Sequence, residues 1–391
     1  MPALYLDYNA THPPDTESIK EASQLYFENY ANTSGISRFS QKASFLLENA
    51  RRNIAQNLNI HSKQIIFTSC ATESNALFMQ SMLKYLHSTR RNRLRALISP
   101  LEHPSVTETL RAQPDIEISI LKSEKNGILD LEYLEEKLKE KPDMLCISHT
   151  HNETGIIQPF HAIARILEKY PVVTLFDSVQ TLPKINNLSL KKENIFEFSK
   201  SLPVFFSVSG HKIGAGFGTG ILIRPDSSIG NHLENYVFAK GGGQEFDIRP
   251  GTHNLASILS FEKVLDKRLK DDKLLDILSS NTDFFERKIT EKLNIGIIGS
   301  NAPRVPGVTA LVFNDINIDF LLLALDQKEI SVSTGSSCKS KTKKPSPALL
   351  ALGYSEKEAS NVLRISYGKS FEHETAARAA NEIHDIAQKI S

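Results

Sequence analysis

From about residue 60 the chain alternates short apolar runs with amphipathic stretches of helical period. The apolar runs predict strands at 64–69, 95–101, 115–121, 144–149, 172–177 and 204–209. The amphipathic stretches predict helices at 72–87, 131–139, 160–170 and 193–202. Strands that alternate with helices form parallel sheets covered by helices on both faces. We therefore expect an α/β fold built on a mostly parallel sheet.

The pattern changes in the last third of the chain. Residues 257–293 are charged and helical in period without a strand signal, and they indicate a connection into a second domain. The sequence beyond them predicts a strand at 308–313 and helices at 319–327 and 374–390. A chain of 391 residues has room for two domains. We expect a large domain at 1–256, whose first 14 residues pack on the other domain, and a smaller α+β domain at 257–391.

Composition excludes several classes of protein. A formal net charge of +1 with 40% hydrophobic and 23% charged residues is ordinary for a globular protein and argues against direct nucleic-acid binding. No apolar run approaches the roughly 18 residues of a membrane span, and the N-terminus shows no export signal, so we expect a cytoplasmic protein. Cys70, Cys146 and Cys338 form no CxxC pair, which predicts reduced thiols and no zinc site.

Lys212 is the first candidate catalytic residue. It ends the sequence Ser-Gly-His-Lys at 209–212, directly after an apolar strand and before the glycine-rich turn 214–220. A lysine at a strand end can bond covalently to an aldehyde cofactor if its surroundings lower the pKa of its amine. The alternative is an ordinary surface lysine. The glycine spacing matches neither nucleotide-binding loop, and another strand, 220–224, follows it.

Two further strand ends carry polar residues. Asp177 closes the strand 172–177, where open α/β sheets bind ligands, and a carboxylate there can pair with a cofactor ring nitrogen. Gln180 follows three residues later. In the turn 68–74 the backbone N–H groups of Ala71 and Thr72 open a helix and attract phosphate. Simple helix capping explains Asp177 and this turn equally well.

His103 and Asn152 also follow predicted strands. The imidazole of His103 can stack on a flat cofactor or move protons, and the amide of Asn152 can donate to a ring oxygen. A purely structural histidine is the alternative. His149 and His151 alternate as metal ligands do, but no third ligand stands nearby, so we expect no metal.

Cys338 and Arg364 lie in the C-terminal part of the chain. Cys338 stands in a small-residue stretch followed by lysines at 339–344, which favour the reactive thiolate. Arg364 lies in the apolar run 362–366 and can bind a carboxylate through two hydrogen bonds. An ordinary exposed cysteine and a salt-bridge arginine are the alternatives. The basic runs 90–95 and 339–344 are short and typical of solvated loops.

In this order along the chain, these features resemble the cysteine desulfurases, a group of class V aminotransferases among the fold-type I pyridoxal-phosphate (PLP) enzymes. The resemblance covers almost the whole chain and is most specific at 209–212 and around Cys338. It implies a large PLP-binding domain with a seven-stranded sheet and a smaller C-terminal domain that carries the cysteine loop. It also implies pyridoxal 5'-phosphate as the cofactor.

The resemblance assigns a role to each candidate. Lys212 holds the cofactor and moves protons, Cys338 receives sulfur, and His103 stacks on the ring. Asp177 pairs with the ring nitrogen, Asn152 and Gln180 contact the ring oxygen, and Arg364, with Asn152, binds substrate. The phosphate contacts implied by the resemblance are Ala71, Thr72, Ser209 and His211, together with Thr252 of the segment 241–252 from a neighbouring subunit. The last contact implies a homodimer.

The implied activity is conversion of L-cysteine to L-alanine, with delivery of sulfur to an acceptor protein such as an iron-sulfur scaffold or a tRNA-thiolation protein. Two alternatives stay open: a selenocysteine lyase or other class V enzyme, and a catalytically weak PLP-binding scaffold for sulfur acceptors. They are motivated by departures from the family pattern, which usually has Gly at Cys70 and His at Ser37. No membrane partner is implied.

Overall fold

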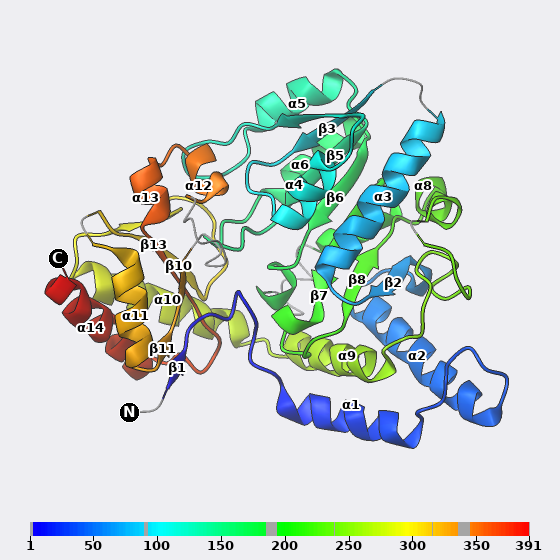
Figure 1. Ribbon diagram of the computed structural model, residues 1–391, viewed down its shortest axis with the longest axis horizontal. Helices are drawn as coiled ribbons and strands as arrows, with labels where there is room; N and C mark the ends of the chain where they lie inside the picture. Colours follow the sequence, from blue (N-terminus) through cyan, green and yellow to red (C-terminus); the bar gives the residue numbers. More distant parts are fainter. Residues whose placement is uncertain are drawn as a thin grey trace.

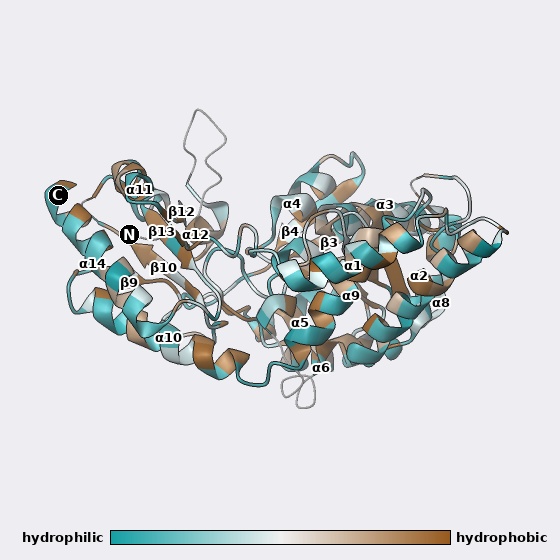
Figure 2. Ribbon diagram, turned by 90° about the horizontal axis from the view of Figure 1, so that it is seen from below, coloured by the Kyte–Doolittle hydropathy of each residue, from teal (hydrophilic) through white to brown (hydrophobic). Residues whose placement is uncertain are grey.

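The computed structural model describes residues 3–89, 93–184, 194–237, 239–314, 316–334 and 345–390. Two lobes lie side by side in Figure 1, and both ends of the chain lie at the smaller lobe. The turned view in Figure 2 shows hydrophobic and hydrophilic residues interleaved along the outer helices, as expected of amphipathic helices over buried cores. No helix in the described ranges is long and apolar enough to cross a membrane.

The larger lobe is organised by a mostly parallel sheet, which in the described part of the chain has seven strands. In spatial order they are β2 (Ile65–Thr68), β8 (Gly220–Ile223), β7 (Val204–Ser209), β6 (Val173–Asp177), β5 (Met144–Ser148), β3 (Leu94–Ile98) and β4 (Ile116–Ile120). β8 runs antiparallel to β2 and β7, and the other neighbours are parallel. The carboxyl ends of the parallel strands therefore meet at one edge.

Helices cover both faces of this sheet. Alternate strand residues point to opposite faces, so Phe205 joins one buried cluster and Phe206 the other. The Phe205 cluster includes residues of α3 (Ala71–Thr89) and α4 (Pro104–Arg111). The Phe206 cluster includes residues of α2 (Arg38–Asn57), α5 (Leu131–Lys139), α6 (Phe160–Lys169) and α9 (Leu255–Leu269). This layering confirms the predicted α/β fold class.

Shorter elements complete the larger lobe. Helix α1 (Thr16–Glu28) packs along α9. The remaining short helices are η1 (Ser62–Gln64), η2 (Leu182–Lys184), η3 (Ile195–Lys200), η4 (Gly210–Lys212), α8 (Ser228–His232) and η5 (Leu233–Asn235).

The smaller lobe has an antiparallel sheet in the order β12 (Ser333–Thr334), β13 (Val362–Ser366), β10 (Val308–Val312) and β9 (Gly296–Ile297). Its helices are α10 (Leu274–Thr290), α11 (Ile318–Gln327), α12 (Pro347–Ala351), α13 (Glu356–Ser360) and α14 (His373–Ile390). Phe285, Leu321 and Ile383 join α10, α11 and α14 to the sheet in one buried cluster, whereas α12 and α13 contribute to another.

An N-terminal strap, residues 3–15, connects the two lobes. Its strand β1 (Leu4–Tyr5) pairs in parallel with β11 (Ile330–Ser331) of the smaller lobe. Leu6 is buried in the smaller lobe's core, and the chain then crosses to α1 in the larger lobe. The strap is visible in blue at the junction of the lobes in Figure 1.

Two predicted segments differ from the structure. In the predicted helix 193–202, the described residues 194–202 contain only the 3-10 helix η3. The connecting segment 257–293 is divided into two helices, α9, which packs on α1 and α2, and α10, which packs on α14. The division of the domains after 256 stays a prediction.

Candidate active site

A cavity of about 240 Å³ lies at the edge where the parallel strands end. It is lined by the predicted residues Ala71, Thr72, His103, Asn152, Asp177, Gln180, Ser209, His211 and Lys212. Thr252 and Arg364 do not line it, and Cys338 lies outside the described residues. The turns after separate strands thus converge because those strands are parallel and in register.

Lys212 ends the short helix η4, which follows β7 directly. Its Nζ donates hydrogen bonds to the backbone oxygens of Asn9 (2.5 Å) and Ala10 (2.7 Å) in the strap. Burial lowers the pKa of Lys212 to about 8, and the positive charge of Arg364 acts in the same direction. Asp7 and Asp177 oppose this shift. The neutral, nucleophilic amine is therefore accessible near neutral pH.

Asp177 ends β6, and its side chain is held at both oxygens. Oδ2 accepts from the Asn75 side-chain amide at 3.1 Å, and Oδ1 accepts from the Val179 backbone N–H at 3.1 Å. The bond from Val179 is a local, cap-like contact of the kind that the sequence analysis gave as the alternative role of Asp177. Because Asp177 also lines the cavity while only 7% exposed, it presents a fixed carboxylate to any ligand there.

The phosphate-binding residues implied by the resemblance, apart from Thr252, all line the cavity. Helix α3 begins at Ala71, so its first N–H groups are free of intrahelical partners. The Ser209 hydroxyl is buried without a hydrogen-bond partner in the described residues. A Cβ at Gly220 would lie 2.5 Å from the carbonyl carbon of Cys70, so only glycine permits this packing of the Cys70 turn.

His211 and His103 are both neutral imidazoles in this setting. Burial and the neighbouring Lys212 lower the pKa of His211 to about 4. Burial also lowers the pKa of His103, with Lys212 adding to the effect and Asp177 opposing it. His103 caps helix α4, where its Nδ1 accepts from the Ser105 backbone N–H at 3.1 Å. The neutral ring of His103 consequently carries its proton on Nε2.

Asn9 of the strap connects several site residues. Its backbone oxygen accepts from Gln180 Nε2 at 3.0 Å as well as from Lys212. Its side-chain amide donates to the Asn152 backbone oxygen at 2.9 Å. The strap therefore forms part of the site even though Asn9 does not line the cavity.

Arg364 lies on β13 of the smaller lobe and is 6% exposed. It forms an ion pair with Asp7 of the strap at 2.7 Å and donates to the Asn152 backbone oxygen at 3.2 Å. Its Nε is buried without a partner in the described residues. The predicted carboxylate-binding group is thus held beside the site by Asp7, and one N–H of its guanidinium is unused.

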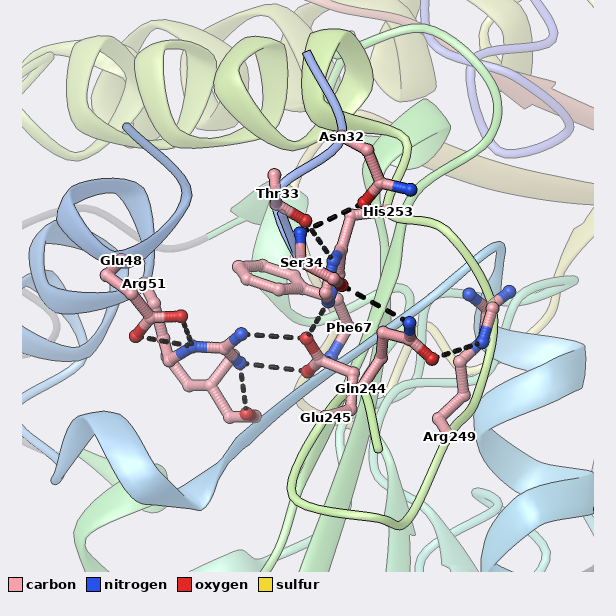
Figure 3. Close-up of polar contacts among 12 residues, drawn as sticks. Asn32, Thr33, Ser34, Glu48, Arg51, Phe67, Gln244, Glu245, Arg249 and His253 are labelled. Atoms are coloured by element: carbon pink, nitrogen blue, oxygen red, sulfur yellow. Dashed lines mark hydrogen bonds and ion pairs between the residues drawn. The ribbon is translucent and has the colours of Figure 1, made fainter. Parts of the chain in front are cut away.

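Thr252 is exposed and directly precedes His253, whose ring contacts the Glu245 carboxylate. Figure 3 shows the polar contacts around Glu245. The Glu245 carboxylate receives two hydrogen bonds from Arg51 (2.7 and 2.8 Å), one from the Phe67 backbone N–H (2.6 Å) and one from His253 (2.6 Å). Burial opposes ionisation of Glu245, but Arg51 and His253 hold its pKa at about 2. We call residues 241–253 the Glu245 segment.

Sequence reasoning missed four residues of the site. Asn75 and Asn9 gave no signal, because their contacts depend on the way α3 and the strap cross the sheet. Asp7 of the strap likewise carried no signal of a role. Glu102 precedes His103 and accepts from the Ser148 backbone N–H, and burial and Asp177 raise its pKa well above the usual range. The position of Glu102 directly before His103 in the sequence was the signal that could have identified it.

A model of the aminotransferase class-V family matches residues 4–376. The chain belongs to the class V aminotransferases. One curated relative is a cysteine desulfurase IscS from Dictyoglomus turgidum. It is 29% identical to this chain, and the match covers 99% of this chain and 95% of that protein. A cysteine desulfurase IscS from Rickettsia typhi is 30% identical, covering 99% and 92%.

Solved structures show the same fold. A NifS-like protein from Rickettsia africae has a TM-score of 0.81 at 26% identity, covering 100% of this chain and 99% of that one. Another structure titled NIFS-like protein has a TM-score of 0.85 at 24% identity, covering 99% and 100%. The seven-stranded sheet and its helices are therefore those of a fold-type I enzyme, as predicted.

Class V aminotransferases depend on pyridoxal 5'-phosphate, and the cavity fits this cofactor. The unpartnered Ser209 hydroxyl and the free start of α3 match a phosphate group. Asp177 matches a protonated ring nitrogen, and the lowered pKa of Lys212 matches an amine that bonds to an aldehyde. The residues present are thus complementary to each end of the cofactor.

Proposed function

We propose that this protein is a cysteine desulfurase that converts L-cysteine to L-alanine and transfers the sulfur to Cys338. One observation carries the proposal: Lys212, with a lowered pKa, and the fixed carboxylate of Asp177 line a single cavity. Membership of the class V aminotransferases supports the cofactor, and the names of the curated relatives support the substrate.

In the proposed mechanism Lys212 would hold the cofactor and Asp177 would pair with the proton of its ring nitrogen. When bound, the cofactor would supply an electron-withdrawing ring that stabilises negative charge at the substrate α-carbon. The neutral amine of Lys212 would take the substrate α-proton as a general base. His103 would pack against the cofactor ring, and Asn152 and Gln180 would contact its oxygen substituent.

Arg364 binds the substrate carboxylate in this proposal. Its unused Nε–H and its position beside Asn152 support the role. The ion pair with Asp7 keeps the guanidinium in one orientation, which lowers the entropy cost of binding a planar carboxylate. The substrate carboxylate therefore either displaces the Asp7 carboxylate from Arg364 or binds the guanidinium beside it.

Cys338 completes the reaction as the sulfur acceptor. Its thiolate attacks the substrate sulfur, so that a sulfur–sulfur bond forms while the substrate carbon–sulfur bond breaks. The carbon takes up a proton and leaves as alanine, and Cys338 retains a persulfide. An acceptor protein in iron-sulfur assembly or thiolation then removes that sulfur. Free thiols at Cys70 and Cys146 support a cytoplasmic setting.

We further propose that the enzyme is a homodimer in which Thr252 contacts the neighbouring subunit's phosphate. Exposed apolar side chains support an interface at the end of α1 and the start of α2. They are Phe27 (67% exposed), Tyr30 (71%), Ile36 (95%), Phe39 (68%) and Phe45 (62%).

The test follows the amine of Lys212 and the sulfur transferred to Cys338 in separate measurements. Borohydride reduction of PLP-saturated protein should fix a pyridoxyl group on Lys212, as read by peptide mass spectrometry. Incubation with cysteine should then add one sulfur to Cys338 of unreduced enzyme and release alanine. Lys212→Ala should abolish both results, whereas Cys338→Ala should keep the pyridoxyl group on Lys212 but lose sulfur transfer and, with it, most of the alanine release. If Cys338→Ala forms alanine at the wild-type rate, the desulfurase proposal fails.

Two comparisons separate the alternatives. A selenocysteine lyase would turn over selenocysteine much faster than cysteine and would leave Cys338 unmodified. A catalytically weak scaffold would bind the cofactor at Lys212 without turnover of either amino acid.

A further inference from the structure

A second cavity, of about 350 Å³, lies where the two lobes meet. The strap contributes Tyr8 and His12, the larger lobe contributes Lys184 and Arg268, and the smaller lobe contributes Gly368 and others. The strap residues between Tyr8 and His12 are those whose carbonyls bind Lys212. The second cavity is therefore adjacent to the active site but has a separate lining.

Lys184 ends the short helix η2 and is only 8% exposed. Its side-chain amine has no hydrogen bond or ion pair with the described residues, although Lys184 lines the cavity. Burial, together with the positive charge of Arg268, lowers the pKa of Lys184 to about 7. A buried amine without a partner is costly to the folded state, so its retention calls for a ligand that compensates it.

Arg268 of α9 is the second cation in this cavity. Its guanidinium donates to the backbone oxygens of Pro183 (2.8 Å) and Ile213 (3.0 Å) and to His12 Nε2 (2.9 Å). These acceptors are neutral, since burial and Arg268 lower the pKa of His12 to about 3. In the described part of the chain no carboxylate forms an ion pair with Arg268, and its Nε is buried without a partner.

The carboxylates in the cavity wall are already paired with other lysines. Asp15 lies 2.9 Å from Lys267, and Asp271 lies 2.8 Å from Lys369. Among the described residues, neither Lys184 nor Arg268 is therefore paired with a carboxylate of its own. Apolar side chains of Val264, Leu274 and Leu278 line the rest of the space.

We propose that this cavity is a binding site for a small organic anion whose phosphate or carboxylate group lies between Lys184 and Arg268. The apolar body of the ligand packs against Leu274 and Leu278 of α10. Because the walls come from both lobes and the strap, the bound anion holds the lobes together. The site does not depend on the proposed desulfurase activity, since it shares no lining residue with the active-site cavity.

The test is isothermal titration calorimetry on the full chain, saturated with PLP and then desalted so that the active-site phosphate position is filled. The probes are phenyl phosphate, benzoate, inorganic phosphate and uncharged benzyl alcohol. We expect the phosphate or the carboxylate probe to bind with one site per chain, and benzyl alcohol not to bind. Phenyl phosphate should bind more tightly than inorganic phosphate because it also fills the apolar part.

Lys184→Met should weaken binding of the anion about tenfold or more, the scale of one hydrogen bond to a charged group. The matched control is Lys270→Met, which removes an exposed lysine of the same region that pairs with Asp266. Equal binding by wild type, Lys184→Met and Lys270→Met would overturn the proposal, as would binding of benzyl alcohol as tight as that of the anions.

A labelling measurement needs no variant. Trace acetylation of the wild-type protein, read by peptide mass spectrometry, reports the accessibility of each lysine amine. Saturating phenyl phosphate or benzoate should reduce acetylation of Lys184 several-fold and leave that of Lys270 unchanged. If neither anion changes the ratio of the two, the cavity does not bind anions, whatever the activity of the enzyme.

Discussion

Lys212 is held by two main-chain carbonyls while burial and Arg364 favour its neutral form. Because its pKa is lowered to about 8, the fraction of free amine rises as the pH passes upward through 8. We expect cofactor-free protein to capture pyridoxal phosphate faster with rising pH, with a midpoint near 8 in stopped-flow absorbance. Asp7→Asn should move the midpoint lower, since Asp7 raises this pKa. A midpoint unchanged from that of a free lysine would contradict the assignment.

Asp177 allows a second prediction, because its carboxylate is fixed by Asn75 and Val179. Asp177→Asn retains the shape but removes the charge, and its single oxygen can accept from only one of Asn75 and Val179. We expect cofactor capture at Lys212 to persist while turnover falls by about 100-fold or more, the scale of losing one preorganised electrostatic partner. Mass spectrometry of the reduced adduct and alanine release measure the two quantities. Normal turnover by this variant would exclude a role for the charge.

The site residues that the sequence predicts are those set by strand ends. Asp177 and Lys212 each follow an apolar run, and parallel strands bring their ends to one edge. Asn9 and Asp7 were beyond this reasoning, since the strap reaches the site only after β1 has paired with a strand far along the chain. The proposed contact of Thr252 is with a second subunit, so its partner could not be found by following the strands of one chain.

The Glu245 segment contains three consecutive residues with left-handed backbone, Glu245 (φ 49°), Phe246 (59°) and Asp247 (63°). Non-glycine residues adopt this conformation only when their surroundings impose it. The buried pair of Glu245 with Arg51 is the strongest such restraint, and each side chain is almost fully buried. The pair therefore fixes the shape in which Thr252 is presented.

We expect Arg51→Met to destabilise the protein by about 3–5 kcal/mol, because it leaves a buried carboxylate without its partner. Thermal unfolding measures this loss. The control is Glu48→Gln, which removes the other, more exposed carboxylate beside Arg51 and should cost about 0–1 kcal/mol. Equal effects of the two substitutions would show that Glu245 does not fix the segment.

Glu245 also predicts a pH dependence of stability. Its folded-state pKa of about 2 lies below the ordinary value of 4.5, so the stabilisation is complete above 4.5 and is lost as the pH falls toward 2. Glu245→Gln should remove this part of the acid sensitivity, as read from denaturant unfolding at several pH values. A variant with the same acid profile as wild type would contradict the prediction.

Among the helices and strands, the sequence predicts best those that are long and bounded by clear signals. Helix α5 follows the Asp130 cap and matches the predicted range, as does β7. The division between α9 and α10 carries no glycine or proline, only the charged run 270–273, so helical period continues through it. Which lobe each half packs on is decided by tertiary contacts that periodicity does not contain.

The strap connects the lobes through very few residues. Leu6 is 3% exposed in the core of the smaller lobe, and three residues later Asn9 supports Lys212. We expect Leu6→Ala to cost about 2–5 kcal/mol of folding free energy and also to weaken cofactor binding at Lys212. Leu323→Ala, at a 62% exposed position of α11, is the control and should change neither. A loss of stability without weaker cofactor binding would show that the strap does not support cofactor binding at Lys212.

The pairing of β1 with β11 has a consequence for how the enzyme matures. Residues 4–5 are translated long before their partner strand at 330–331. Asp7 is likewise translated long before its partner Arg364. A nascent chain that ends before residue 330 therefore lacks the pairing that anchors the strap, whose carbonyls contact Lys212.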